Sequence, residues 1–231
     1  MPARDESADD WQEERDVTST LKHCEQDRKS LAAQHATHEV VPAYYSVKEA
    51  IFPFAKFQGV DPILGPEMRS TGEVMGVGRT FPEAFSRAEE AASIKAPPVG
   101  KAFVSVRDAD KPRVMDVARL LVERGFSLVA TGGTADYLAA QGVACERINK
   151  VAEGRPHVVD LIKNGEILYI INTTEGKAAI ADSFSIRREA LQHRLTYSTT
   201  IPGARALIQA IDSRNHPRVW SLQELHGELQ A

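Results

Sequence analysis

The sequence predicts an α/β protein with a doubly wound parallel sheet, preceded by a smaller partial domain and a polar leader. Apolar strand-like runs alternate with helix-like runs from about residue 101 onwards, an order that is typical of parallel sheets covered by helices. Polar turns also follow several of these strand-like runs. Such turns are expected where ligands bind, at the carboxyl ends of parallel strands.

The composition of the 231 residues, with 42% hydrophobic and 26% charged residues, is ordinary for a globular protein. A net charge of −4 gives no general attraction to nucleic acid or to anionic membranes. No apolar run approaches the roughly 20 residues of a membrane span, and the acidic N-terminus does not resemble a secretory signal. Cys24 and Cys145 lie in unrelated contexts, so we expect a reduced, cytoplasmic chain without disulfides.

Residues 1–38 are expected to form a polar, disordered leader, because they are rich in charged and amide side chains and poor in branched apolar ones. His23, Cys24, His35 and His38 lie in this leader. Their spacing matches no standard metal site, and we expect no metal there.

Residues 39–96 are expected to form a small unit of their own. Two extended segments, 40–47 and 51–54, are broken by proline, and a turn-rich stretch follows at 59–78. The glycines of that stretch do not fit a nucleotide-binding spacing.

A helix is predicted from residue 81 to about 93, with Thr80 as its N-cap and Glu83 completing a capping box. Pro97 and Pro98 then mark a break. We therefore place the boundary of the α/β domain here, at residues 97–231.

Within this domain, the apolar run 167–171 is the most continuous, as expected for a central parallel strand. Helical spacing of apolar residues supports a helix at 111–124. The strands are predicted at 102–106, 126–130, 145–148, 167–171 and 195–198. The helices are predicted at 111–124, 134–141, 157–164, 177–193 and 204–211.

The turn formed by Thr131, Gly132, Gly133 and Thr134 lies between a predicted strand and a predicted helix. Backbone N–H groups, threonine hydroxyls and the positive end of the helix macrodipole meet there, which suits a phosphate. The same residues also suit a purely structural turn, because Thr often caps helices and Gly-Gly often forms turns.

Further polar residues follow the other predicted strands. Because the strands are parallel, we expect these residues at one edge of the sheet, where lysines, hydroxyls and an amide would form a phosphate pocket. Taken singly, each has an equally good structural explanation as a cap or a solvated side chain. They are Ser105, Lys111, Lys150, Asn172, Thr173 and Thr174.

No catalytic set emerges beside this pocket. Cys145 has no activating histidine in view and is expected to be structural. His157 begins a predicted helix, where capping is the simplest role, and Asp160 and Asp182 lack an evident partner.

Several long motifs carry a resemblance to a known family. Residues 44–49, 65–76, 149–157 and 171–174 closely resemble the C-terminal part of the large subunit of carbamoyl-phosphate synthetase. The resemblance covers about residues 39–230. It implies that 97–231 is a methylglyoxal-synthase-like (MGS-like) allosteric domain and that 39–96 is the tail of the second ATP-grasp unit.

The resemblance also implies ligands and partners. The family pocket binds UMP or IMP, and the pocket residues named above would contact phosphate and ribose, with Asp182 nearby. Tyr197 and Thr199 fall where the family contacts ornithine. The partners would be the remaining ATP-grasp part and the glutaminase small subunit, in pyrimidine and arginine biosynthesis. No nucleic acid or membrane is implied.

The sequence departs from the family in lacking the ATP-grasp bodies. We therefore expect no catalysis, no metal and no cofactor in this chain; ATP, Mg and K are implied only for the complete synthetase. Two alternatives stay open. One is a stand-alone enzyme like methylglyoxal synthase or IMP cyclohydrolase, although the Gly-Gly-Asp loop of the former is absent. The other is an inactive truncated fragment.

Overall fold

A parallel β-sheet organises the chain in a computed structural model that describes residues 37, 41–52, 72–213 and 219–227. The chain divides into two compact units, Met1–Pro42 and Ala43–Ala231. All the elements below belong to the second unit. The expected leader at 1–38 lies almost entirely outside the described residues, as do the turns at 59–71.

The sheet has five strands in the order β5-β4-β3-β6-β7, and every neighbouring pair is parallel. The chain winds outwards from β3 through β4 to β5, then crosses back to place β6 beside β3. The doubly wound prediction is therefore confirmed, and the winding reverses between β3 and β6. The strands are β3 (Lys101–Ser105), β4 (Ser127–Thr131), β5 (Glu146–Ile148), β6 (Ile167–Asn172) and β7 (Thr196–Ser198).

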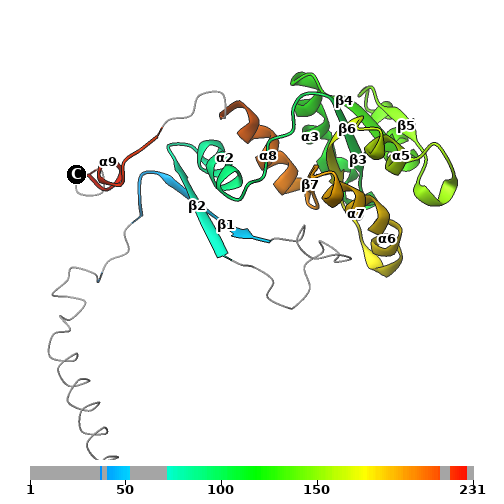
Figure 1. Cartoon of the computed structure of the whole chain (residues 1–231). Coiled ribbons are helices and arrows are strands. Elements are labelled where there is room, and N and C mark those ends of the chain that lie inside the picture. The colour runs from blue at the N-terminus through cyan, green and yellow to red at the C-terminus, as the bar shows by residue number, and fades with distance from the viewer. Residues whose placement is uncertain (1–36, 38–40, 53–71, 214–218, 228–231) are drawn as a thin grey trace, which may run out of the picture. The chain divides into compact units, whose positions relative to one another are not determined.

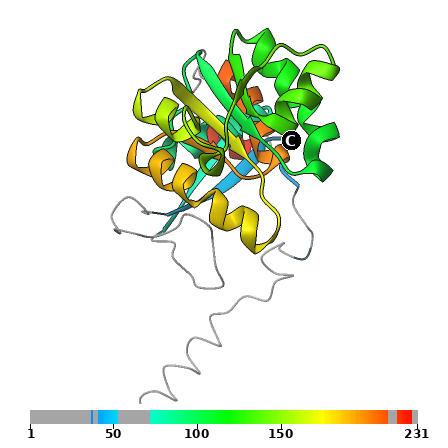
Figure 2. The ribbon, with the colours of Figure 1, turned by 90° about the vertical axis from the view of Figure 1, so that its right-hand side faces the viewer.

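Helices cover both faces of this sheet (Figures 1 and 2). Successive strand residues point to opposite faces, so Phe103 and Val104 enter different apolar clusters. Val104 packs in a cluster with α3 (Lys111–Glu123), α4 (Gly132–Ala140) and α8 (Ile201–Ser213). Phe103 packs in a cluster with α5 (Val158–Lys163) and α7 (Phe184–Gln192).

The single helix predicted at 177–193 is wrong. The structure has two helices there, α6 (Gly176–Asp182) and α7, which meet at Ser183. In a continuous helix the Ile180 carbonyl would accept from the backbone of Phe184. Instead it accepts a 2.9 Å hydrogen bond from Nη2 of Arg187, a side chain that is only 2% exposed. A partly buried side-chain hydrogen bond from the next helix thus replaces a backbone bond of a continuous helix.

The turn-rich interpretation of 59–78 is also wrong at its C-terminal end, where β2 (Gly72–Gly78) pairs antiparallel with β1 (Tyr45–Ile51). The glycines that suggested turns instead allow the next helix to pack closely against the strand. A Cβ added to Gly76 would lie 2.1 Å from the carbonyl oxygen of Ala84 and 2.4 Å from the amide nitrogen of Ala88. The backbone of the next helix therefore lies directly on this strand.

That helix, α2 (Phe81–Ala91), begins as predicted. The Thr80 N-cap is confirmed, since its hydroxyl accepts from the Glu83 N–H at 3.4 Å. The Glu83 carboxylate accepts from the N–H of Arg79, the residue before the N-cap, at 2.8 Å, a variation on the predicted capping box. Helix α2 packs against both β2 and α8.

The domain boundary at residue 97 stays a prediction. A short helix that was not predicted, α9 (Leu222–Gly227), follows Trp220.

Candidate functional site

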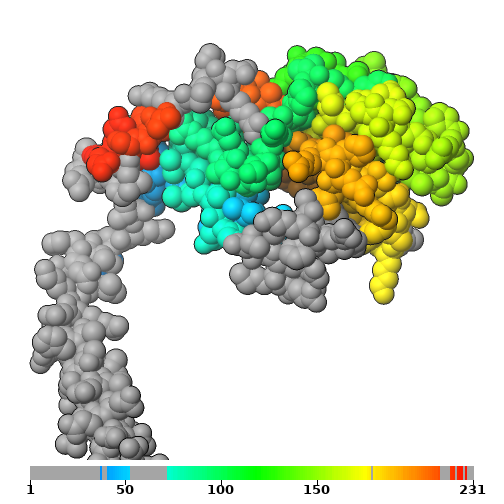
Figure 3. All heavy atoms as spheres, viewed as in Figure 1, coloured from blue at the N-terminus to red at the C-terminus, as the bar shows by residue number. Residues whose placement is uncertain are grey.

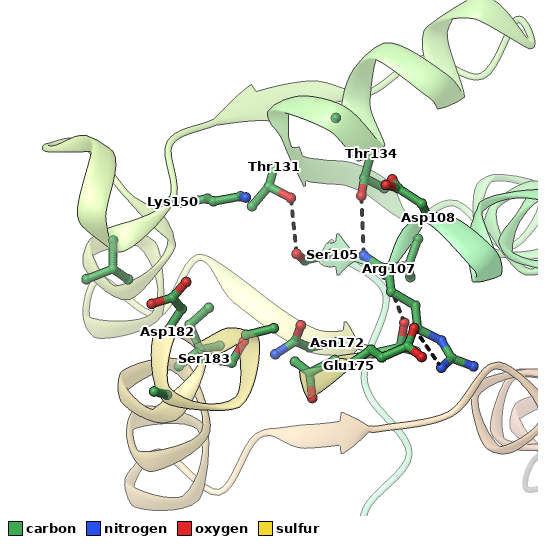
Figure 4. Close-up of a pocket in the computed structure, with 18 of the residues that line it drawn as sticks. Ser105, Arg107, Asp108, Thr131, Thr134, Lys150, Asn172, Glu175, Asp182 and Ser183 are labelled. Carbon is green, nitrogen blue, oxygen red and sulfur yellow. Dashed lines mark hydrogen bonds and ion pairs between the residues drawn. The ribbon is translucent and has the colours of Figure 1, made fainter. Parts of the chain in front are cut away.

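A cavity of about 920 Å³ opens at the carboxyl ends of β3, β4 and β6 (Figure 4). This position borders the reversal of winding, where doubly wound sheets bind their ligands. The volume lies within the range of small-molecule sites. The predicted residues that line it are Ser105, Lys111, Thr131, Gly133, Thr134, Lys150, Asn172, Thr173, Thr174 and Asp182.

Hydroxyl groups connect the ends of β3 and β4. The Ser105 and Thr131 hydroxyl oxygens lie 3.1 Å apart, and a single hydrogen bond uses only one of their two hydrogens. The Thr134 hydroxyl accepts from the Val106 N–H at 3.2 Å, so its own hydrogen also stays available. These contacts hold the pocket together and still leave hydroxyl donors for a ligand.

The end of β6 is tied in by a similar bond. The Thr173 hydroxyl accepts from the Arg107 N–H at 3.1 Å. Beside it, the Asn172 side-chain amide donates to the Tyr197 hydroxyl at 2.8 Å, and Asn172 is only 3% exposed. The buried amide is therefore held in a fixed orientation.

Helix α4 begins at the pocket. Thr131 occupies its N-cap position, yet within the described structure its side chain makes no capping bond, because the hydroxyl faces Ser105. The first N–H groups of a helix have no intrahelical partner. Together with the helix dipole they favour an anion at this point.

Lys111 supplies positive charge beside that helix start. A Cβ added to Gly133 would lie 3.3 Å from the Lys111 ammonium, so glycine leaves room for the lysine. The ammonium forms a 2.7 Å ion pair with Asp108, in the short 3₁₀ helix Asp108–Asp110. The hydrogen bond from Lys111 holds the pKa of Asp108 below its usual range.

Lys150 approaches from β5 and points towards Thr131 in Figure 4. It occupies the N-cap position of a 3₁₀ turn, Val151–Glu153, and its backbone N–H donates to the Glu153 carboxylate at 2.8 Å. The backbone is therefore fixed independently of the side chain. The ammonium adds a second positive charge to the pocket.

The structure adds residues that sequence reasoning missed. Arg107, Asp108 and Glu175 also line the cavity, and each follows a strand end closely enough that the same rule would have found them. Residues 183–186 line it as well. No sequence signal indicated these, because they were assigned to the interior of one helix.

Some predicted residues do not line the cavity. Gly132 lies under Arg147 instead, since an added Cβ would be 2.7 Å from Nη2 of that side chain. Tyr197 lies outside the lining and hydrogen-bonds to Asn172, and Thr199 is exposed outside the lining.

The cavity lining combines lysine ammonium groups, several hydroxyls, one side-chain amide and the carboxylates of Asp108, Glu175 and Asp182. In the described part of the chain, no group of three or more His, Cys, Asp or Glu side chains is placed to hold a metal. Burial raises the pKa of Cys145 to about 11, which keeps this thiol protonated and unreactive at neutral pH. Among the described helices, none is long and apolar enough to cross a membrane.

A family match gives the class of the domain that holds most of the pocket. Residues 113–199 match the family model of the MGS-like domain, and they include most of the pocket. Among solved structures, the crystal structure of methylglyoxal synthase from Elizabethkingia anophelis NUHP1 aligns with a TM-score of 0.39 and 16% identity. That alignment covers 49% of this chain and 79% of the other.

Curated relatives identify the family. The carbamoyl phosphate synthase large chain of Xanthomonas axonopodis pv. citri is 74% identical over 88% of this chain and 19% of the relative. The large chain of Pseudomonas syringae pv. tomato is 58% identical over the same shares. The chain belongs to the carbamoyl phosphate synthase large-chain family, as a C-terminal section that contains the MGS-like domain. It spans about a fifth of the length of these relatives.

Proposed function

We propose that residues 97–231 form the allosteric domain of a carbamoyl phosphate synthase and that the pocket binds a nucleoside monophosphate, UMP or IMP, through its phosphate. The observation that carries the proposal is the convergence of Lys111, Lys150 and the start of α4 on one cavity. Cationic side chains and a helix N-terminus together form a strong anion site.

The remainder of the cavity suits a nucleoside. Val106, Val151 and Ile186 provide apolar surface, and Phe184 adds an aromatic ring that is 38% exposed. Asp182, at the end of α6, also lines the cavity. A carboxylate there accepts hydrogen bonds from sugar hydroxyls. We propose Asp182 and Asn172 as sugar-side contacts.

The direct test is calorimetric titration of the chain with UMP and IMP, alongside uridine and inosine. We expect either nucleotide to bind measurably and its nucleoside to bind far more weakly, because the phosphate makes the charged contacts. Equal binding of nucleoside and nucleotide would place the phosphate outside the site. Absence of binding by both nucleotides would refute the proposed function.

Asp108→Asn is expected to tighten nucleotide binding by roughly twofold to fivefold, the range for an exposed ion pair. The Asp108 carboxylate now pairs with Lys111 at 2.7 Å and repels an incoming phosphate. Removing its charge frees the ammonium. Asp116→Asn, on the exposed face of α3, is the matched control and should leave the affinity unchanged. Weaker binding by Asp108→Asn would show that this carboxylate contacts the ligand favourably.

The chain by itself is expected neither to hydrolyse ATP nor to form carbamoyl phosphate. The motivating observation is that its sequence contains no ATP-grasp body. Incubation with ATP, Mg, glutamine and bicarbonate, followed by ADP measurement, tests this. Bicarbonate-dependent ATPase activity that survives rigorous purification would contradict it. Release of methylglyoxal from dihydroxyacetone phosphate would instead favour the stand-alone lyase.

We further propose that the chain acts with the remaining ATP-grasp part of the large subunit and with the glutaminase small subunit, in the cytoplasm, in pyrimidine and arginine biosynthesis. The high identity to complete large chains supports this. Residues 39–96 would then be the ATP-grasp tail. Tyr197 and Thr199 are proposed as ornithine contacts on the resemblance alone.

A further inference from the structure

Helix α6 forms a wall of the cavity without being anchored in the core. Ala179, Ala181 and Asp182 line the cavity, yet none of the described side chains of α6 is buried. In Figure 3 the yellow atoms of this part of the chain project from the molecular surface. Segments with little buried apolar surface are the ones that open most readily.

Arginine side chains attach this helix to the domain at both of its ends. At the N-terminal end, Nη1 of Arg107 pairs with the Glu175 carboxylate at 3.2 Å, and that carboxylate is 67% exposed. In the last turn, Nη2 of Arg187 donates to the Ile180 carbonyl at 2.9 Å. An exposed ion pair contributes little, whereas a partly buried hydrogen bond from a charged donor contributes more.

Arg187 connects α6 to a helix that is firmly packed. Its own helix, α7, buries Ile186 and Ala190 in the cluster on one face of the sheet. The same hydrogen bond accompanies the break at Ser183, and the residues of that break, 183–186, line the cavity. Arg187 itself does not line the cavity.

We propose that Arg187 is a positioning residue, which holds α6 and the junction at 183–186 as the nucleoside-side wall of the pocket. The expected effect of Arg187 on nucleotide affinity rests on the proposed function. The expected effect of Arg187 on the stability of α6 does not depend on any ligand. The phosphate side, built on Lys111, Lys150 and the start of α4, belongs to other elements and should be unaffected.

The test compares Arg187→Met with Arg188→Met, an exposed neighbour on the same helix. In hydrogen exchange of the ligand-free chain, we expect amides 179–182, the ones with acceptors inside α6, to exchange at least about tenfold faster in Arg187→Met. In calorimetry, we expect UMP or IMP to bind about tenfold or more weakly. Inorganic phosphate, titrated by phosphorus NMR, should bind as it does to the unmodified chain. Arg188→Met should match the unmodified chain in all three measurements.

Arg187→Lys serves if the methionine variant does not fold, because it keeps the charge and loses the guanidinium geometry; we expect a smaller change in the same direction. Unchanged exchange in α6 for a folded variant would overturn the inference. An equal loss of phosphate and nucleotide affinity would also overturn it, because it would indicate a general structural role. If the unmodified chain binds neither nucleotide, the proposed function fails, while the exchange measurement still decides the role of Arg187.

Discussion

Lys150→Ala is expected to weaken nucleotide binding by about 2 kcal/mol or more, the range for losing a charged hydrogen-bonding partner, or roughly 30-fold in Kd. The substitution removes the ammonium and little else. The local turn is held by the backbone N–H of residue 150 and the Glu153 carboxylate at 2.8 Å, a bond that alanine retains. Calorimetric titration with UMP and IMP measures the effect.

Lys163→Ala provides the matched control. That lysine is 54% exposed, and its nearest charged partner is Glu189 at 3.5 Å. It lies outside the cavity lining, so its removal should leave nucleotide affinity unchanged. If Lys150→Ala binds UMP and IMP as tightly as this control does, the assignment of Lys150 to the phosphate is wrong.

Gly76→Ala is expected to lower the free energy of unfolding by about 3 kcal/mol, at the upper end of the usual range for overpacking. The new Cβ would lie 2.1 Å from the Ala84 carbonyl oxygen and 2.4 Å from the Ala88 amide nitrogen. Both are backbone atoms of α2, so no side chain can rotate away to make room. Relief requires α2 to move away from β2. Urea unfolding followed by circular dichroism measures the loss.

Gly72→Ala, on the same strand, is the control for that measurement. Among the described residues, no atom lies within 4 Å of a Cβ placed there, and the residue is exposed. Its stability should stay close to that of the unmodified chain. Equal stabilities of the two variants would show that α2 does not rest directly on the strand at Gly76.

The sequence by itself determined the α/β class, most of the elements of the sheet domain, and where its polar residues would gather. The physical reason is local. Apolar periodicity indicates strands and helices, and a parallel sheet then brings every strand's carboxyl end to one edge. Ser105, Thr131 and Asn172, far apart in the chain, therefore lie at one cavity. The capping pattern of Thr80 and Glu83 was readable for the same reason, since its contacts span only a few residues.

Only the tertiary structure decided which of these local signals would be overruled. A glycine-rich stretch became strand β2 because a helix packs on Gly76, and the sequence around a glycine does not reveal what will approach it. The single helix predicted at 177–193 is two helices that meet at Ser183, because the guanidinium of Arg187 donates a hydrogen bond to the Ile180 carbonyl. That break brings residues 183–186 to the cavity. Both outcomes depend on close contacts that form only when the elements pack together. The apolar periodicity of either segment does not predict those contacts.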